Sequence, residues 1–334
     1  MLGSTDRPLC EAYDLAMLDL DGVVYVGGDA VPEAPEHLAR VRKAGMRLAF
    51  ITNNAARPPA RVAEHLRELG VDATAEDVVT SAQAAARVLV ERVGPGARVV
   101  LLGADGLREA LEDEGLVPVP VSEDDAAAVV SGYGPDLRWR DIMRATVRIR
   151  DGLFWVASNT DRSIPTAYGV APGHGVLVDT IRGFSGVDPV VAGKPQRPLL
   201  DETVRRVGGE RPLMVGDRLD TDIEGARNAG LESLLVLTGV TGLGELVAAP
   251  PEQRPTYIAA DLAGLLEAHP PTTDDGDGAV VLGGWRATVG GGRLSVSGSG
   301  EAGDWWRVCA VAGWRHLDAS GEPADVDGVA SEHD

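Results

Sequence analysis

The chain has 334 residues, of which 44% are hydrophobic, so it is long enough to form two or more domains with buried cores. Its formal net charge of -20 and sequence pI of about 4.7 argue against nonspecific binding to nucleic acid, which rewards lysine and arginine. The two cysteines, Cys10 and Cys309, have no paired spacing and argue against a disulfide framework or a zinc site. We expect a cytoplasmic protein, because residues 1–11 lack a leader pattern and no apolar run approaches the ~18 residues that span a bilayer.

The first apolar run, at 15–18, predicts a strand buried on both faces in a parallel sheet, and it is followed by Asp19 and Asp21. Ligands of α/β folds bind at the carboxyl ends of such strands, and Gly22 lets the backbone approach a bound group. Alternatively, both acids only end the strand and cap a turn. Asp19 and Asp21 are therefore candidates for catalysis or metal binding.

A second buried strand, at 48–51, follows a helix predicted over 32–43 and ends on Thr52, Asn53 and Asn54. A strand, helix and strand of this length form a right-handed crossover, so we expect Thr52 at the same sheet edge as Asp19. Hydroxyl and amide groups there can donate hydrogen bonds to phosphoryl oxygens. Alternatively, they cap the helix predicted over 58–69.

Residues 98–182 alternate strands with helices between loops rich in glycine and proline, which predicts a self-contained α/β insert. An insert above a sheet edge can act as a lid. Its loop at 158–165 places polar residues directly after a buried strand and is a candidate substrate-facing loop, or else an ordinary turn.

The pattern of the first segment resumes at 190–195, where Lys194 precedes a helix with Pro198 near its start. Lys194 is either a functional ammonium or a solvated surface charge. The strand at 213–215 leads to Asp217, and Asp220 and Asp222 open the next helix, where acids are also favoured by the helix dipole.

The character of the chain changes past residue 270. Residues 271–278 read as a linker, and a hairpin at 285–296 and a helix at 304–317 follow. This segment holds four tryptophans, Trp285, Trp305, Trp306 and Trp314, and so small a unit is expected to dock on the main body or on a partner chain.

Four motifs together resemble the haloacid dehalogenase-like (HAD) phosphatase superfamily. They are LDLDGV at 18–23, FITNN at 50–54, AGKP at 192–195 and VGDRLDTDI at 215–223. The resemblance covers about residues 12–262 and is to subclass IIA, which has a large α/β cap between the second and third motifs. Within that subclass, the chain is similar to actinobacterial glycerol 3-phosphate phosphatases.

The resemblance implies an α/β fold: a doubly wound, Rossmann-like parallel-sheet core with an inserted α/β cap domain and a small C-terminal ββα extension. The expected boundaries are 1–93 for the first part of the core, 94–184 for the cap, 185–270 for the second part of the core, 271–278 for the linker, 279–320 for the extension and 321–334 for a disordered acidic tail.

Three converging acids would repel one another, and an oxygen-ligating dication such as Mg²⁺ relieves that repulsion. The resemblance implies the roles in detail. Asp19 attacks phosphorus to give an aspartyl-phosphate, and Asp21 serves as acid and base while its backbone carbonyl binds the metal. The metal ligands are Asp19, Asp21 and Asp217, and the phosphate-binding residues are Thr52, Asn53, Asn54 and Lys194. Asp222 orients Lys194 or a metal-bound water, and Asp19, Asp21, Thr52 and Lys194 form the catalytic set.

The predicted function is Mg²⁺-dependent hydrolysis of a small phosphate monoester, with glycerol 3-phosphate as the first candidate. The alternative is 2-phosphoglycolate, or broad activity on 4-nitrophenyl and sugar phosphates. The expected partner is a small phosphorylated metabolite rather than nucleic acid or membrane. The sequence leaves open whether the chain forms a homo-oligomer. From another class, the chain could be a non-catalytic scaffold whose Trp-rich tail binds a partner; the intact motif acids argue against this.

Overall fold

The computed structural model describes residues 2–166 and 168–329. The chain forms two compact units. The first comprises residues 1–48, 69–71 and 209–334, and the second comprises residues 49–68 and 72–208. Strand β4 (Arg47–Thr52) begins in the first unit and continues in the second.

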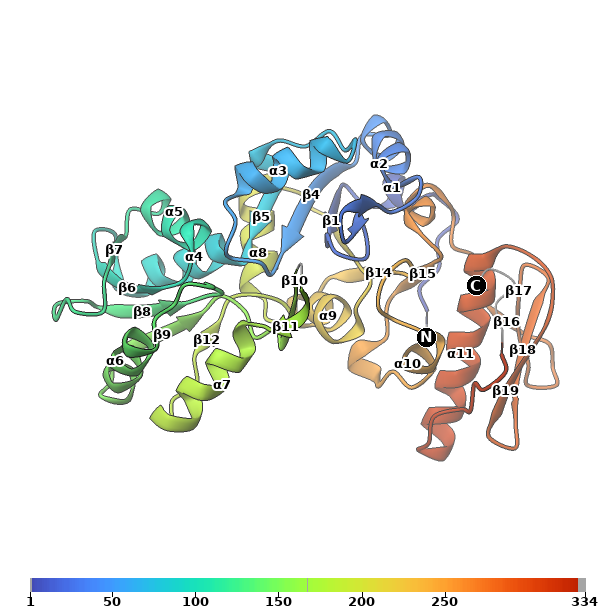
Figure 1. The fold of residues 1–334 in the computed structure, drawn as a ribbon. Helices are drawn as coiled ribbons and strands as arrows, with labels where there is room; N and C mark the ends of the chain where they lie inside the picture. Colours follow the sequence, from blue (N-terminus) through green and yellow to red (C-terminus); the bar gives the residue numbers. More distant parts are fainter. Residues whose placement is uncertain (1, 167, 330–334) are drawn as a thin grey trace. The chain divides into compact units, whose positions relative to one another are not determined.

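The centre of the first unit is a set of parallel strands in the order β15-β14-β13-β1 (Figure 1). Their bounds are β1 (Leu15–Leu18), β13 (Pro212–Gly216), β14 (Glu232–Val236) and β15 (Tyr257–Ala259). The other elements of this unit before residue 270 are α1 (Leu9–Ala12), β2 (Tyr25–Val26), β3 (Asp29–Ala30), α2 (Ala34–Lys43), α9 (Glu224–Ala229) and α10 (Leu243–Val247). A π-helical turn at Leu219–Ile223 leads into α9, and 3-10 turns lie at Pro251–Gln253 and Leu262–Leu266.

Strand β1 is an interior strand because all four of its side chains are apolar and completely buried. It pairs in parallel with β13, so that Leu18 lies opposite Val215. The backbone N–H of Asp19 continues this ladder by donating to the Val215 carbonyl at 2.9 Å. The chain therefore leaves both strands at the same edge, which brings the segments that follow them together.

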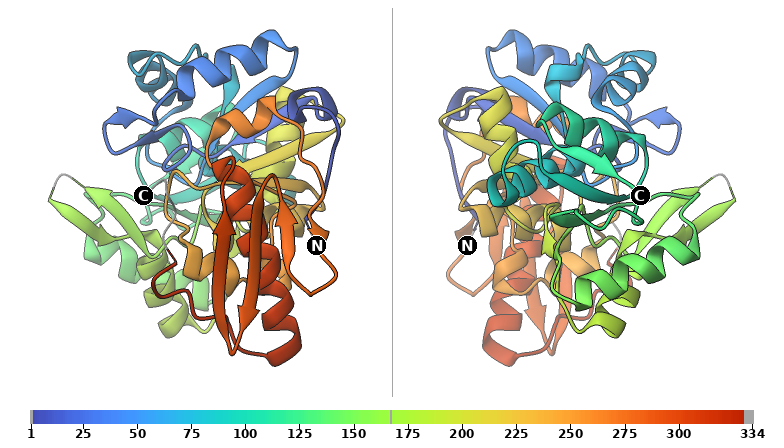
Figure 2. Two further views of the ribbon diagram at one scale, coloured as in Figure 1. Left: turned by 90° about the vertical axis from the view of Figure 1, so that its right-hand side faces the viewer. Right: turned by 90° about the vertical axis from the view of Figure 1, so that its left-hand side faces the viewer.

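The C-terminal extension packs on this unit through tryptophans. It consists of a four-stranded sheet, β16 (Thr273–Asp274), β17 (Val280–Leu282), β18 (Trp285–Gly290) and β19 (Arg293–Gly298), together with helix α11 (Ala302–Ser320). Figure 2 shows α11 lying along β18 and β19. Trp305 and Trp314 belong to the same buried cluster as Ile223 and Ile258 of the core, and the Trp314 indole donates to the Leu246 carbonyl at 2.7 Å. The extension thus docks on the main body, as expected, and β16 and β17 enlarge the predicted hairpin.

A buried polar network ties α11 to β15 and to the segment that follows it. Arg307 donates to the Ile258 carbonyl at 2.9 Å, to Asp304 at 2.9 Å and to Nδ1 of His269 at 3.0 Å. A guanidinium only donates, so Nδ1 accepts and the proton of His269 is on Nε2, which donates to the Gly264 carbonyl at 2.8 Å. Burial and the charge of Arg307 lower the pKa of His269 to about 4.

The second unit contains a parallel sheet in the order β12-β9-β8-β6-β7. Its strands are β6 (Arg98–Leu102), β7 (Val117–Val119), β8 (Ala128–Ser131), β9 (Phe154–Ala157) and β12 (Val190–Val191). Its helices are α3 (Pro59–Glu68), α4 (Ser81–Val93), α5 (Asp105–Asp113), α6 (Trp139–Arg150), α7 (His174–Ser185) and α8 (Pro198–Val207). Strand β5 (Val78–Thr80) pairs in parallel with β4, and β10 (Ser163–Thr166) and β11 (Gly169–Pro172) form an antiparallel hairpin.

Local sequence signals set several of these boundaries. Helix α4 begins with a capping box, in which the Thr80 hydroxyl accepts from the Gln83 backbone and the Gln83 side chain accepts from the Thr80 backbone. It ends at Gly94, whose φ of 83° only glycine adopts readily. The β10-β11 hairpin lies in a stretch where the sequence predicts a loop.

The structure confirms the predicted fold class, an α/β protein with a Rossmann-like parallel sheet. Across the described ranges, no helix combines the length and apolar character needed to cross a membrane. In the segment predicted as an acidic tail, Asp325 pairs with Arg293 through its backbone and side chain. Residues 330–334 lie outside the described part of the chain. The predicted domain boundaries stay a prediction.

Candidate active site

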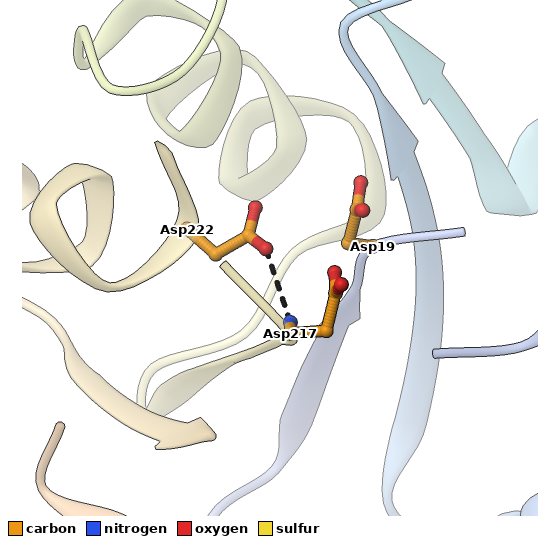
Figure 3. A group of neighbouring side chains, drawn as sticks. All are labelled: Asp19, Asp217 and Asp222. Atoms are coloured by element: carbon orange, nitrogen blue, oxygen red, sulfur yellow. Dashed lines mark hydrogen bonds between the residues drawn. The ribbon is translucent and has the colours of Figure 1, made fainter. Parts of the chain in front are cut away.

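Three carboxylates meet at the carboxyl end of β1 and β13. Asp19, Asp217 and Asp222 each offer a carboxylate oxygen, and these oxygens all lie within 4.8 Å of one another (Figure 3). Asp217 and Asp222 are completely buried. Grouped anions of this kind repel in a low-dielectric site and provide the hard oxygen ligands that Mg²⁺ and Ca²⁺ prefer.

The loop after β14 fixes Asp217. The Val240 backbone N–H donates to Oδ2 of Asp217 at 2.8 Å, and the Thr241 hydroxyl donates to its backbone carbonyl at 2.6 Å. Two glycines leave room for the carboxylate, because a Cβ at Gly22 or at Gly239 would collide with it. Gly22 also has a φ of 85°, which disfavours any other residue.

Asp222 is placed by backbone amides. Its Oδ2 accepts from the backbone N–H of Asp217 at 3.2 Å, the contact dashed in Figure 3, and from that of Arg218 at 3.1 Å. The π-helical turn after β13 carries this carboxylate back to the strand end. Burial opposes the charge of Arg218, but its hydrogen bond to Asp220 and the nearby acids outweigh burial, so its pKa is raised above its usual value.

Asp21 lies two residues past Asp19 in a tight turn. Its backbone forms a bridge with Tyr25, and the next N–H, of Gly22, donates to the Tyr25 carbonyl at 2.8 Å. The side chain of Asp21 is exposed. It is not a member of the group formed by Asp19, Asp217 and Asp222.

In the second unit, further predicted polar residues lie at and just after the end of β4. The Thr52 hydroxyl accepts from the Asn54 backbone N–H at 3.1 Å, and Oδ1 of Asn54 accepts from the Ala56 backbone N–H at 2.8 Å. These are the turn contacts that the sequence offers as an alternative to phosphate binding. They leave the N–H groups of the Asn54 side chain outside these bonds.

Asn53 joins its own strand end to Lys194. Its Oδ1 accepts from the Lys194 backbone N–H at 2.8 Å, and its Nδ2 donates to the Lys194 carbonyl at 3.0 Å and to Asp161 at 3.0 Å. Lys194 is 2% exposed, so it is a buried lysine rather than a solvated surface charge. Gly193 permits this approach, because a Cβ there would lie 2.6 Å from Oδ1 of Asn53.

The loop after β9 supports the same assembly. Asn159 donates to the Asn53 carbonyl at 2.7 Å and accepts from the Asp161 backbone N–H at 3.1 Å. His174 lies behind it with Nδ1 2.8 Å from the Asn159 carbonyl, which requires the proton on Nδ1. Burial lowers the pKa of His174 to about 4, so this histidine is neutral at pH 7.

Two groups of contacts were not predicted. Val240 and Thr241 follow β14, and the polar Thr238 and the flexible Gly239 just before them are the local signal of a functional loop at that strand end. Asn159 and Asp161 lie in the loop that the sequence marks as substrate-facing, but no local pattern indicates their bonds to Asn53.

Two family profiles match separate parts of the chain. The profile described as haloacid dehalogenase-like hydrolase matches residues 16–117, and one described as HAD-hydrolase-like matches residues 191–265. With the relatives below, these matches show that the chain belongs to the haloacid dehalogenase-like hydrolases, as its motifs predict.

The individual relatives are phosphatases by name. The chain is 44% identical over 303 residues to D-glycerol 3-phosphate phosphatase of Mycobacterium tuberculosis, covering 89% of this chain and 82% of the relative. A crystal structure of glycerol phosphate phosphatase from the same organism, in complex with magnesium, superposes with a TM-score of 0.82 at 43% identity over 92% of each chain. The 4-nitrophenylphosphatase of Thermotoga maritima matches with a TM-score of 0.71 at 31% identity, over 77% of this chain and 98% of that one.

Proposed function

We propose that this protein is a Mg²⁺-dependent phosphatase that hydrolyses a small phosphate monoester, glycerol 3-phosphate first, through an aspartyl-phosphate. The single observation that carries the proposal is the cluster of three carboxylates, those of Asp19, Asp217 and Asp222, at the carboxyl end of β1 and β13. The relative at 44% identity, which is named a D-glycerol 3-phosphate phosphatase, supports the choice of substrate.

The residues present suit a magnesium ion. All three side chains offer carboxylate oxygens, and two of them are completely buried, which is costly for like charges unless a cation compensates them. We assign the ligands as the carboxylates of Asp19 and Asp217 and the backbone carbonyl of Asp21. Asp222, held by two backbone N–H groups, completes the negative field. When bound, Mg²⁺ supplies charge neutralisation for the meeting of two anions.

The chain's own residues then perform the transfer. The Asp19 carboxylate attacks phosphorus, and Asp21 gives its proton to the departing alkoxide. Asp21 next takes a proton from the water that hydrolyses the aspartyl-phosphate. The exposure of the Asp21 side chain is compatible with this exchange of protons. Thr52, Asn54 and the Lys194 ammonium are the proposed phosphate contacts.

Other substrates of the same class have support of their own. A relative named acid sugar phosphatase, from Staphylococcus aureus, is 34% identical over 252 residues, and the Thermotoga maritima relative is named a 4-nitrophenylphosphatase. Broad activity on sugar or aryl phosphates is therefore the second candidate, together with 2-phosphoglycolate.

The alternative of a non-catalytic scaffold depends on tryptophans of the C-terminal extension being exposed to a partner. Trp285, Trp305 and Trp314 are at most 5% exposed and pack in the core cluster, so they present little surface to a partner. The cytoplasmic location, the lack of nucleic-acid binding and a homo-oligomeric state stay predictions.

The test measures phosphate release from glycerol 3-phosphate, 2-phosphoglycolate, 4-nitrophenyl phosphate and a sugar phosphate by the full chain, with Mg²⁺ and with excess chelator. We expect Mg²⁺-dependent release, fastest from glycerol 3-phosphate. Asp19→Asn, which keeps the shape of the side chain but weakens the nucleophile, should lower kcat by at least about 1000-fold. Unchanged release by that variant, or release unaffected by chelator, would contradict the proposal.

A further inference from the structure

The side chain of Asn53 is fully engaged within the second unit. Its two N–H groups donate to the Lys194 carbonyl and to Oδ1 of Asp161, each at 3.0 Å, and its Oδ1 accepts from the Lys194 backbone N–H at 2.8 Å. A primary amide has two N–H donors, and both are used. A phosphoryl oxygen needs a donor, and this side chain has none left to offer it.

The orientation of this amide follows from its partners. Reversing it would point oxygen at the Lys194 carbonyl and the Asp161 carboxylate, and nitrogen at the Lys194 N–H. Each of the three bonds would become a contact between two acceptors or two donors. The assignment is therefore fixed by the surrounding groups.

The backbone of Asn53 is held as firmly as its side chain. Its carbonyl accepts from the Ser81 hydroxyl at 2.5 Å and from Nδ2 of Asn159 at 2.7 Å. Asn159 also accepts from the backbone N–H of Asp161. The end of β4, the start of α4, the loop after β9 and the segment between β12 and α8 thus meet at one asparagine.

We propose that the side chain of Asn53 positions other groups rather than binding phosphate: it fixes the backbone of Lys194 and links it to Asp161, so that the loop after β9 sets where the lysine lies. The inference rests on the proposed function, in which the Lys194 ammonium contacts the substrate phosphate. It revises the predicted substrate-binding role of the Asn53 side chain.

An exchange of the two partners tests the link. In Asn53→Asp, a carboxylate oxygen replaces the donor that faces Asp161 and the Lys194 carbonyl, so two acceptor contacts turn repulsive. Adding Asp161→Asn supplies a new N–H donor to that carboxylate. A matched control, Asn53→Asp with Asp188→Asn, makes the same change in net charge at a side chain that is 79% exposed.

The measurements are kcat, KM and the thermal unfolding midpoint of the full-length chain for wild type, Asn53→Asp, Asp161→Asn and both double variants. We expect Asn53→Asp to lower kcat about 100-fold with a smaller change in KM, as misplacement of a reacting group does. The Asp161→Asn double variant should recover kcat at least about tenfold and raise the unfolding midpoint, whereas the Asp188→Asn double variant should do neither.

Equal kcat values and midpoints for the two double variants would overturn the inference, because a side chain that bound phosphate directly would not depend on residue 161. A wild-type chain without phosphate release would overturn the proposed function instead. The unfolding midpoints would then still show whether the effect of the substitution at Asn53 depends on residue 161.

Discussion

Asp217 in the first unit and Lys194 in the second are both buried ionisable residues that follow a strand, and their surroundings differ in kind. Asp217 has two further carboxylates within 4.8 Å and receives backbone N–H groups. Lys194 has its backbone clamped by a neutral amide, that of Asn53. The first arrangement concentrates negative charge and gains from a cation, whereas the second is a network of hydrogen bonds centred on the amide of Asn53.

The largest expected effect is on the charged arrangement. Asp217→Asn removes one of three carboxylates while keeping an acceptor for Val240, so Mg²⁺ affinity and kcat/KM should fall by at least about 100-fold. In chelator, the same change relieves repulsion and should raise the free energy of unfolding by about 1 kcal/mol. Metal titration and urea unfolding with and without Mg²⁺ measure both effects. A variant less stable than wild type in chelator would refute the repulsion argument.

Lys194→Met tests the other arrangement. Under the proposed function, loss of the ammonium should lower kcat/KM about 100-fold, because that function assigns to it the stabilisation of charge that develops on the phosphate. The backbone clamp of Asn53 does not involve the side chain of residue 194, so the fold should persist. Kinetics combined with circular dichroism separates the two, and an unfolded variant would mean that the lysine side chain is structural.

Two glycine substitutions sharpen the contrast. A Cβ at Gly239 would collide with the Asp217 carboxylate, and a Cβ at Gly193 would lie 2.6 Å from Oδ1 of Asn53 and 2.7 Å from the Ser158 carbonyl. Each change to alanine should cost about 2 kcal/mol of stability through overpacking. Only Gly239→Ala should also weaken Mg²⁺ binding, which isothermal titration measures. Equal loss of Mg²⁺ affinity in both variants would remove the distinction.

Buried histidines give each unit a pH dependence. The folded pKa of His174 and of His269 is about 4, below the unfolded value of 6.5. The unfolded chain therefore binds more protons between about pH 6.5 and pH 4, and stability decreases as the pH falls through that window. At pH 5 each histidine should cost about 2 kcal/mol relative to pH 7.5.

Isosteric variants isolate these contributions. His174→Asn places an N–H near the position of Nδ1, and His269→Gln places one near that of Nε2, so each keeps the main donor. Urea unfolding at pH 7.5 and pH 5 should show a smaller loss on acidification for each variant than for wild type. An unchanged loss would mean that another group titrates.

The smallest expected effect provides the baseline. Arg61 pairs with Glu64 on the surface of α3 at 2.8 Å, with side chains 72% and 51% exposed. Arg61→Ala should change the free energy of unfolding by less than about 0.5 kcal/mol and leave kcat unchanged, because exposed pairs contribute little. A larger change by urea unfolding would show that surface charge in this unit is coupled to its interior.

The sequence by itself determined the strands and the polar residues that follow them. Runs such as 15–18 and 213–215 are entirely apolar, and an apolar run that stops at a carboxylate locates a strand end without knowledge of its neighbours. The family motifs are built on those ends, which is why the fold class was predictable, together with the position of Asp19 and Asp217 at the ends of neighbouring strands. The β10-β11 hairpin was not, since its residues show no alternation of apolar and polar character.

The tertiary structure alone decided which partners these side chains have. Asn53 forms hydrogen bonds with Asp161 and Lys194, which are 108 and 141 positions further along the chain. Arg307 forms one with His269, which is 38 positions away. Asp222 joins the other acids because a π-helical turn, rather than a regular helix start, returns its carboxylate to the strand end. A hydrogen bond depends on distance and direction between groups that only folding brings together, and no local pattern in the chain encodes these.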